Sequence, residues 1–204
     1  MLTFVKKSTM ILALAIITLT AAGRAGSPVA EIGKAAPGFT LTDLEGKATS
    51  LSDFAGRIVV LEWTNPNCPV VRRTYGSGIM NALQKEYTAR GVVWLTVNST
   101  SPRHDDNETP AAQKELYAAW KASPTAQLLD LEGAVGRAFG AKTTPHMFII
   151  DRTGSLAYNG AIDDDPRGGS TDRKVFVKDA LDALLAGKTV AVSMSKPYGC
   201  GVKY

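Results

Sequence analysis

The stretch IVVLEWTNPNCPVVRR, residues 58–73, joins a run of mostly β-branched and other apolar residues to the start of a helix. A near-continuous apolar run of this length is typical of a strand buried on both faces of a sheet. Pro69 suits the first turn of a helix, where its missing N–H group costs nothing. Cys68, one of two cysteines in the chain, therefore stands between a buried strand and a helix.

The residues that follow predict another helix-to-strand connection. Apolar residues recur at helical spacing from Ile79 to Tyr87, in a helix expected to begin near Pro69 and to end at Gly91. Residues 92–97 are a second apolar run that predicts another buried strand. A strand, a helix and a strand in this order predict a right-handed parallel crossover.

Shorter patterns extend this unit on both sides. Residues 39–51 alternate around a turn and predict a hairpin, and Thr109-Pro110 is typical of a helix N-terminus. Residues 147–150 and 156–162 flank a glycine-containing turn and predict an antiparallel pair. The other predicted elements are a short strand at 126–129, a short helix at 133–139 and an amphipathic helix at 177–185. The sum is an α/β fold with a mixed central sheet, parallel in its centre and antiparallel at one edge, with helices on both faces.

The beginning of the chain is typical of a secretory signal peptide. Lys6-Lys7 precedes an apolar run over residues 10–22, and small residues follow. The run is short for a membrane anchor, so a cleaved signal at residues 1–25 is favoured. The predicted division is then a signal at 1–25, a domain at 26–188 and a tail at 189–204, in an exported protein that is periplasmic or secreted.

The charge pattern changes once the signal is set aside. The 204-residue chain has a formal net charge of +4. Three of its 23 basic residues and none of its 19 acidic ones fall within residues 1–25, so the remainder is nearly neutral. This balance argues against nucleic acid as a partner. Export implies an oxidising compartment, in which two cysteines can form a disulfide.

Four polar residues in and after the first predicted strand carry candidate chemistry. At a helix N-terminus the free N–H groups and the helix dipole favour a thiolate, so Cys68 is a candidate reactive thiol; an inert buried cysteine or half of a structural bridge is the alternative. Arg72 or Arg73 could add positive potential. Glu62 lies inside an apolar strand, either as a buried proton acceptor or as an outward-facing residue.

A metal site is a minor alternative. Cys68, Cys200 and His146 could together bind a soft metal. The sequence has no CxxC motif and no paired-histidine spacing, so no cofactor is predicted, and His146 is interpreted as a polar residue beside the pocket.

Several motifs together resemble a known family. VVLEW, then Cys68-Pro69 at a helix start, then TTPHMFIID and DRTGSLAYNGAID, resemble the thioredoxin-like superfamily over about residues 31–188. The resemblance is closest to the redoxin branch, the alkyl hydroperoxide reductase/thiol-specific antioxidant type. NPNCPVVRRTY together with KPYGCGVKY is similar to a group of exported bacterial redoxins.

The resemblance implies roles for individual residues. Cys68 matches the nucleophilic cysteine, and Glu62 falls near a buried acid that assists proton transfer. Pro145 matches a cis-proline that packs against the nucleophile, and Thr144 would offer backbone contacts to a bound substrate. Pro69 and Asn67, which flank Cys68, complete the predicted substrate-binding set.

The chain also departs from the family patterns. Val71 stands where the thioredoxin motif has its second cysteine, and Asn65 and Leu61 stand where the peroxidase motif PxxxTxxC has threonine and proline. Some redoxins carry the resolving cysteine on a C-terminal tail, which makes Cys200 the candidate. A permanent Cys68–Cys200 bridge, or a bridge between two chains, remains an alternative.

The leading hypothesis is an exported thiol-disulfide oxidoreductase that uses Cys68 and Cys200. A thiol peroxidase with the same residues is the close alternative. A binding or metal-chaperone module without catalysis is another, as is a structural disulfide domain. The expected partners are a thiol or disulfide protein, or a small peroxide, with an external thiol reductant; the oligomeric state is left open.

Overall fold

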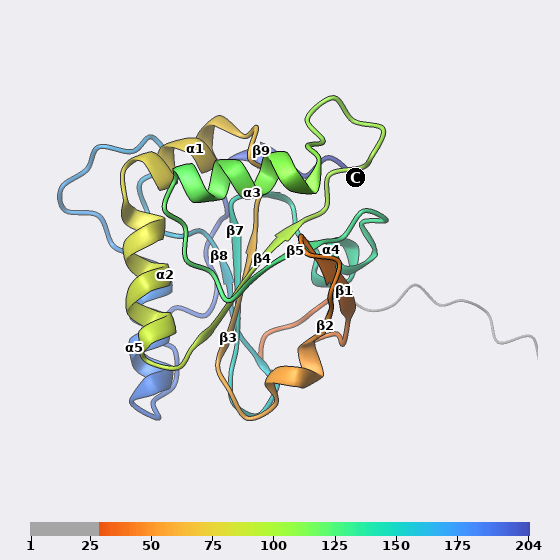
Figure 1. The fold of residues 1–204 in the computed structure, drawn as a ribbon. Coiled ribbons are helices and arrows are strands. Elements are labelled where there is room, and N and C mark those ends of the chain that lie inside the picture. Colours follow the sequence, from red (N-terminus) through yellow and green to blue (C-terminus); the bar gives the residue numbers. More distant parts are fainter. Residues whose placement is uncertain (1–28) are drawn as a thin grey trace, which may run out of the picture.

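The computed structural model describes residues 29–204, and the predicted signal peptide lies outside the described residues. Within residues 29–204 no helix combines the length and apolar character needed to cross a membrane. Most of the described chain surrounds one twisted sheet, with the helices on its two faces (Figure 1).

The main sheet has seven strands in the order β2-β1-β5-β4-β3-β7-β8. The strands are β1 Thr40–Asp43, β2 Ala48–Ser50, β3 Val59–Trp63, β4 Val93–Asn98, β5 Ala126–Leu129, β7 His146–Ile150 and β8 Leu156–Gly160. Strands β3, β4 and β5 are parallel, whereas β7, β8, β1 and β2 pair antiparallel with their neighbours. The predicted antiparallel pair of residues 147–150 and 156–162 at one edge is confirmed as β7 and β8. The hairpin β1–β2 adds a second antiparallel edge by pairing with β5, which the sequence did not predict. Its sequence shows the hairpin but not the strand that it pairs with.

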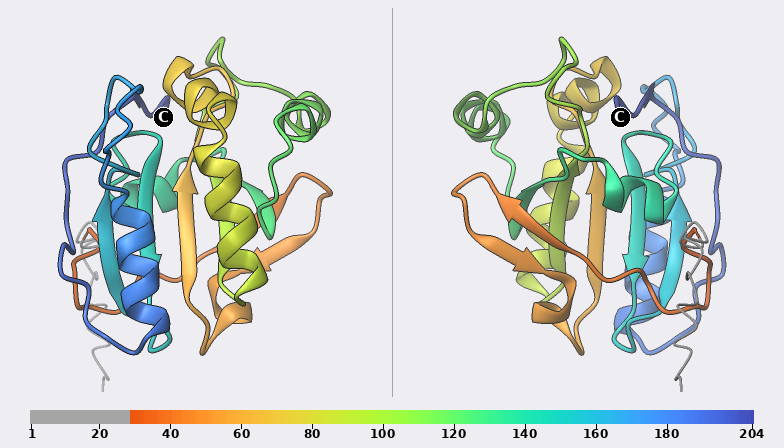
Figure 2. Two further views of the ribbon diagram at one scale, coloured as in Figure 1. Left: turned by 90° about the vertical axis from the view of Figure 1, so that its left-hand side faces the viewer. Right: turned by 90° about the vertical axis from the view of Figure 1, so that its right-hand side faces the viewer.

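Helices cover both faces of the sheet, as predicted. They are α1 Pro69–Gly76, α2 Ile79–Ala89, α3 Pro110–Ala119, α4 Ala134–Phe139 and α5 Phe176–Leu185, with a 3-10 helix η1 at Leu51–Phe54. Helices α2 and α5 lie side by side on one face, and α4 lies on the other (Figure 2). The Tyr87 hydroxyl of α2 donates to Asp182 of α5 over 3.0 Å, which joins the two helices.

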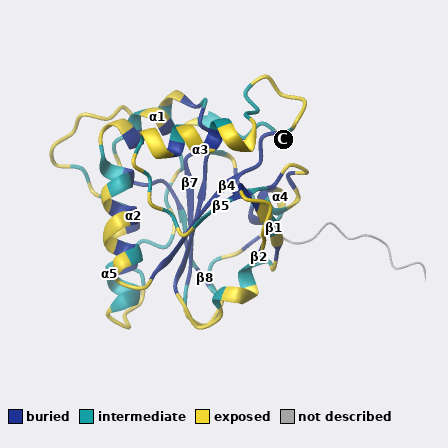
Figure 3. Cartoon of the chain, in the orientation of Figure 1, coloured by how far each residue is buried: buried dark blue, intermediate teal, exposed yellow. Residues whose placement is uncertain are grey.

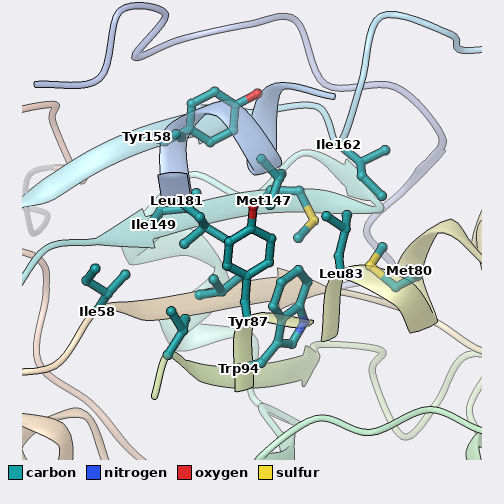
Figure 4. Packing of buried hydrophobic residues seen from close by; sticks show 14 of the residues in the cluster. Ile58, Met80, Leu83, Tyr87, Trp94, Met147, Ile149, Tyr158, Ile162 and Leu181 are labelled. Carbon is teal, nitrogen blue, oxygen red and sulfur yellow. The ribbon is translucent and has the colours of Figure 1, made fainter. Parts of the chain in front are cut away.

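Each face of the sheet has its own apolar core, and the strands are the most deeply buried part of the chain (Figure 3). On the face of α2 and α5, Trp94 and Met147 pack against Tyr87 and Leu181 (Figure 4). On the face of α4 the core is mainly aliphatic, with an aromatic cluster of Trp63, Phe139 and Phe148. Successive residues of β3 alternate between these two cores, as expected for a central strand.

The sequence predicts one helix between Pro69 and Gly91, and this prediction was wrong. Two helices are present, and the chain breaks between them at Ser77-Gly78. Gly78 has φ +80°, a left-handed conformation that glycine adopts without a steric penalty. The break lets α1 stay close to Cys68 while α2 packs along the sheet.

The tail, residues 189–204, is bound along its length to the domain. Its first part runs beside β8, where the Asn159 N–H donates to the Ser193 carbonyl over 3.0 Å. Its second part forms strand β9, Cys200–Gly201, which pairs antiparallel with β6, Thr143–Thr144. The sequence patterns predict no strand here, because a two-residue ladder has no periodicity to detect.

Candidate active site

Cys68 follows β3 after the turn formed by residues 64–67 and is the N-cap residue of α1. Its N–H donates to the Asn65 carbonyl over 3.0 Å, which closes the turn between strand and helix. Pro69 is the first residue of α1 and is exposed. The Cys68 side chain is only 3% exposed. The thiol therefore lies at the predicted position but is shielded from solvent.

The segment before β7 lies against this thiol. The Thr144–Pro145 peptide bond is cis, which confirms the predicted cis-proline. The Cys68 thiol donates to the Thr144 carbonyl oxygen over 3.0 Å. Within the described part of the chain, the buried Thr144 hydroxyl has no hydrogen-bond partner, which leaves it available as a donor once Cys68 ionises.

Cys200 lies beside Cys68. It is the β9 residue opposite Thr144, and its thiol and its N–H are both within hydrogen-bonding reach of the Cys68 sulfur. Both cysteines are free thiols. Val71 is fully buried in the first turn of α1. The structure thus brings together two cysteines that are far apart in the sequence.

A glycine allows this close approach. Gly199 has φ +132°, and a Cβ there would overlap the Thr144 carbonyl oxygen and lie 2.8 Å from the carbonyl carbon. Gly201, on the other side of Cys200, would have no described atom within 4 Å of a Cβ. Only Gly199 is therefore needed for β9 to lie against β6.

Hydrogen bonds favour the thiolate form of Cys68. Burial raises the pKa of the Cys68 thiol, but this is outweighed by hydrogen bonds that the thiolate can accept from the Cys200 thiol, the Thr144 hydroxyl and two backbone N–H groups. The pKa therefore lies below its ordinary value. The N–H groups belong to Val71 and Cys200. The dipole of α1 acts in the same direction.

The pKa of the Cys200 thiol lies above its ordinary value. Burial, and then the hydrogen bond to Cys68 and the Cys68 charge, raise the pKa of Cys200 to about 11. In the reduced protein Cys68 is therefore the better nucleophile, and Cys200 holds the proton.

Glu62 is buried inside the sheet, so the outward-facing alternative was wrong. Its carboxylate accepts hydrogen bonds from Tyr75 over 2.9 Å, from Gln84 over 3.1 Å and from Trp94 over 2.8 Å. Burial raises its pKa from 4.5 to about 7, although the three donors act against this shift. Its contacts are with this polar cluster, and its predicted role in proton transfer stays a prediction.

The raised pKa of Glu62 predicts a pH-dependent stability difference. Between about pH 4.5 and pH 7 the unfolded chain loses the Glu62 proton and the folded protein keeps it, so folding becomes less favourable as the pH rises. Glu62→Gln mimics the protonated acid. We expect equal stability at pH 4.5, and a variant more stable by about 3 kcal/mol at pH 8. Urea unfolding of both proteins at several pH values measures this difference.

His146 contributes an opposite pH dependence of stability, and the comparison with Glu62→Gln removes it. Burial lowers the pKa of His146 from 6.5 to about 4, so His146 makes folding more favourable as the pH rises through the same window. The two trends oppose each other in the wild type, and only the difference between wild type and Glu62→Gln isolates the carboxylate. A difference that does not change with pH would contradict the raised pKa of Glu62.

His146 is bonded inside the protein at both ring nitrogens. Nδ1 accepts from the Lys142 N–H over 3.2 Å, and Nε2 contacts Asn159 Oδ1 at 2.8 Å. Among residues 29–204 no group of three histidine, cysteine or acidic side chains is arranged to hold a metal. The alternative site of Cys68, Cys200 and His146 is therefore not assembled here.

Asn67 is occupied by structural contacts. Its amide donates to Glu108 over 2.8 Å and accepts from Arg72 over 2.6 Å. Arg73 donates to the carbonyls of Pro166 and Arg167. The two arginines thus bind neighbouring loops, while the thiolate is favoured by hydrogen bonds.

Some residues at the site were missed by the sequence reasoning. Tyr198 and Tyr204 hold the tail, and Tyr75, Gln84 and Trp94 surround Glu62. Tyr198 precedes Cys200 by two residues in KPYGC, and this proximity is the one signal that could have drawn attention to it.

A nucleophilic thiol at a helix N-terminus, beside a cis-proline on a mixed sheet, defines the thioredoxin-like class of proteins. Residues 32–159 match the AhpC/TSA family. The chain belongs to this family. The matched segment contains Cys68 and Pro145 and ends before Cys200.

Relatives and solved structures agree with this assignment. The thiol-disulfide oxidoreductase ResA of Bacillus thuringiensis subsp. konkukian is 32% identical over 127 residues, which cover 62% of this chain and 67% of the relative. An uncharacterised conserved protein from Geobacillus kaustophilus is 28% identical with a TM-score of 0.76, over 85% of this chain and 92% of that one. A putative thiol:disulfide interchange protein DsbE from Chlorobium tepidum is 29% identical with a TM-score of 0.53, over 64% and 84%. The predicted family, the thioredoxin-like fold and the oxidoreductase class are confirmed.

Proposed function

We propose that this protein is an exported thiol-disulfide oxidoreductase in which Cys68 attacks the substrate and Cys200 resolves the mixed disulfide. The observation that carries the proposal is the contact between the two thiols, whose pKa values are shifted in opposite directions. The named activity of the relative ResA supports the same reaction.

The reaction has three exchanges. The Cys68 thiolate attacks one sulfur of a substrate disulfide, so that an S–S bond forms on Cys68 and the other substrate sulfur leaves as a thiolate and takes a proton. Cys200, after losing its proton, attacks the Cys68 sulfur and releases the second substrate thiol. An external dithiol then reduces the Cys68–Cys200 disulfide, which restores both thiols and supplies the two electrons.

The electrostatics support this order of events. In the reduced protein the hydrogen bond to Cys68 and the charge of Cys68 both raise the pKa of Cys200. Once Cys68 is in a mixed disulfide it carries no charge, and that contribution disappears. Cys200 then ionises more readily at the step in which its thiolate is required.

Two features favour a disulfide over a peroxide as the electrophile. Asn65 stands in the place of the peroxidase threonine, and its amide is used in hydrogen bonds to Thr100 and Asn67. Strand β6 beside Cys68 pairs with the extended segment β9 in the reduced protein, and an extended polypeptide can pair with the same backbone groups when β9 moves aside. Thr144, Pro145 and Pro69 are the proposed substrate contacts, and Asn67 is proposed to hold the loop beside them.

Parallel oxidation of the reduced protein tests the proposal. The protein is mixed with a protein disulfide such as insulin or with hydrogen peroxide, and loss of the Cys68 thiol is followed by mass spectrometry. We expect faster oxidation by the disulfide, and none at this position in Cys68→Ser. Fast oxidation by peroxide with slow exchange would favour the thiol peroxidase instead.

A further inference from the structure

The segment that carries Cys200 is held by a tyrosine on each side. Tyr198 lies two residues before Cys200 and Tyr204 lies four residues after it. Between them the backbone ladder of β9 and β6 is only two residues long. So short a ladder contributes little by itself in water, and the side chains on either side must supply much of the binding.

Tyr198 is anchored to a buried carboxylate. Its hydroxyl donates to Asp163, which is 2% exposed and lies after β8. Asp163 also accepts from the Asp165 N–H over 3.0 Å and faces Arg173 at 3.5 Å. Burial and the Asp163 carboxylate raise the pKa of Tyr198, so the hydroxyl keeps the proton that it donates.

Tyr204 fits a notch on α4. A Cβ on Gly136 would lie 2.6 Å from the Tyr204 hydroxyl oxygen, and a Cβ on Gly133 would lie 2.5 Å from its ring. The guanidinium of Arg137 stacks on the ring at 4.8 Å from its centre. The hydroxyl donates to the Ala141 carbonyl over 2.9 Å. The glycines leave the space that the tyrosine fills.

The backbone near Tyr204 is also bound. The Val202 N–H donates to the Lys142 carbonyl over 3.2 Å, and the Ser101 N–H donates to the Lys203 carbonyl over 2.7 Å. The tail therefore crosses from β8, past Cys68, to the loop after β4, with an anchor on each side of the cysteine.

We propose that Tyr198 and Tyr204 are positioning residues that clamp β9 on β6 and so set the effective concentration of the Cys200 thiol at Cys68. An effective concentration depends on how tightly the geometry holds the two groups together. The same clamp covers Cys68 in the reduced protein. The part that concerns resolution rests on the proposed function, whereas the part that concerns shielding does not.

The shielding is tested without any disulfide. In a Cys200→Ser background, Cys68 is alkylated with iodoacetamide, and the rate is compared for otherwise wild-type protein, Tyr198→Phe and Tyr204→Ala. Alkylation requires β9 to open locally. We expect both variants to react at least about fivefold faster, because each loses an anchor. Tyr204→Phe keeps the ring in the notch and should restore most of the protection. Met194→Ala is the matched control, since this side chain of the same tail is 64% exposed.

The effective concentration is measured with Cys200 present. Each protein is equilibrated with mixtures of reduced and oxidised dithiothreitol, and the fraction of Cys68–Cys200 disulfide gives the equilibrium constant. We expect Tyr204→Ala to lower this constant about tenfold, a rise of about 30 mV in the reduction potential. Urea unfolding of the reduced protein should lose no more than the free energy of this tenfold change, about 1.4 kcal/mol. A larger loss would mean that the substitution destabilises the whole domain rather than the position of the tail.

The outcomes are distinguishable. An alkylation rate unchanged in both Tyr198→Phe and Tyr204→Ala would overturn the clamp. If the wild type forms no Cys68–Cys200 disulfide while the variants still lose protection, the proposed resolving role fails and the clamp stands. Equal equilibrium constants in wild type and Tyr204→Ala would overturn the positioning role.

Discussion

Replacing Cys200 by serine is expected to stop turnover and to leave a stable mixed disulfide on Cys68. Serine has nearly the size of cysteine, so β9 should stay on β6, and the Cys68 thiolate can still attack a disulfide. The second exchange then has no thiol, and multiple-turnover reduction should fall by about 100-fold or more. Turnover is measured with insulin and an external dithiol, and the adduct on Cys68 is identified by mass spectrometry.

Two comparisons decide this prediction. Cys68→Ser should show neither turnover nor adduct, because it lacks the attacking thiol. If Cys200→Ser turns over as fast as the wild type, the external dithiol resolves the adduct directly and the intramolecular route is wrong. The serine hydroxyl can still donate a hydrogen bond to the Cys68 sulfur in place of the Cys200 thiol, so the Cys68 pKa of this variant should stay below its ordinary value.

Substituting the glycine before Cys200 is expected to have the next largest effect. In Gly199→Ala the new Cβ meets the backbone of Thr144, and φ +132° is a conformation that alanine rarely adopts. Such backbone strain costs about 1–3 kcal/mol, enough to lower the effective concentration of Cys200 about tenfold or more. Equilibration with dithiothreitol measures the loss.

Gly201→Ala is the matched control. It makes the same change in size two residues further on, where a Cβ would have no described neighbour within 4 Å. It should behave as the wild type in the equilibration and in turnover. Equal losses in both variants would mean that a general increase in tail stiffness, rather than the approach to Thr144, limits the reaction.

Much of the fold could be predicted from the sequence because its strands are long and apolar. The apolar runs before Cys68 and at residues 92–97 are compatible with few structures other than buried strands. They form the parallel pair β3–β4. The place of the hairpin β1–β2 could not be predicted, because strand pairing depends on contacts between distant segments. The helix break at Gly78 could have been considered, since glycine inside a helical pattern is a known point of weakness.

The residues of the candidate site could also be predicted only in part. Cys68 and Pro145 lie in local patterns, and the structure brings them together at one edge of the sheet. The approach of Cys200 depends on the backbone of the tail and on the notch over α4, and neither leaves a periodic pattern in the sequence. The burial of Glu62 was left open because alternation along a strand does not reveal which faces are covered.

Val71, in place of a second cysteine, has a consequence for how the redox couple can be adjusted. In a CxxC motif the same short turn determines both the acidity of the nucleophile and the strain of its disulfide. Here the Cys200 thiol and N–H on β9 lower the pKa of Cys68 together with Thr144 and the Val71 N–H of α1. The same strand β9 and its anchors govern how readily the bridge closes. Substitutions in the tail should therefore change the reduction potential and the strength of the nucleophile together, although the two segments are far apart in the sequence.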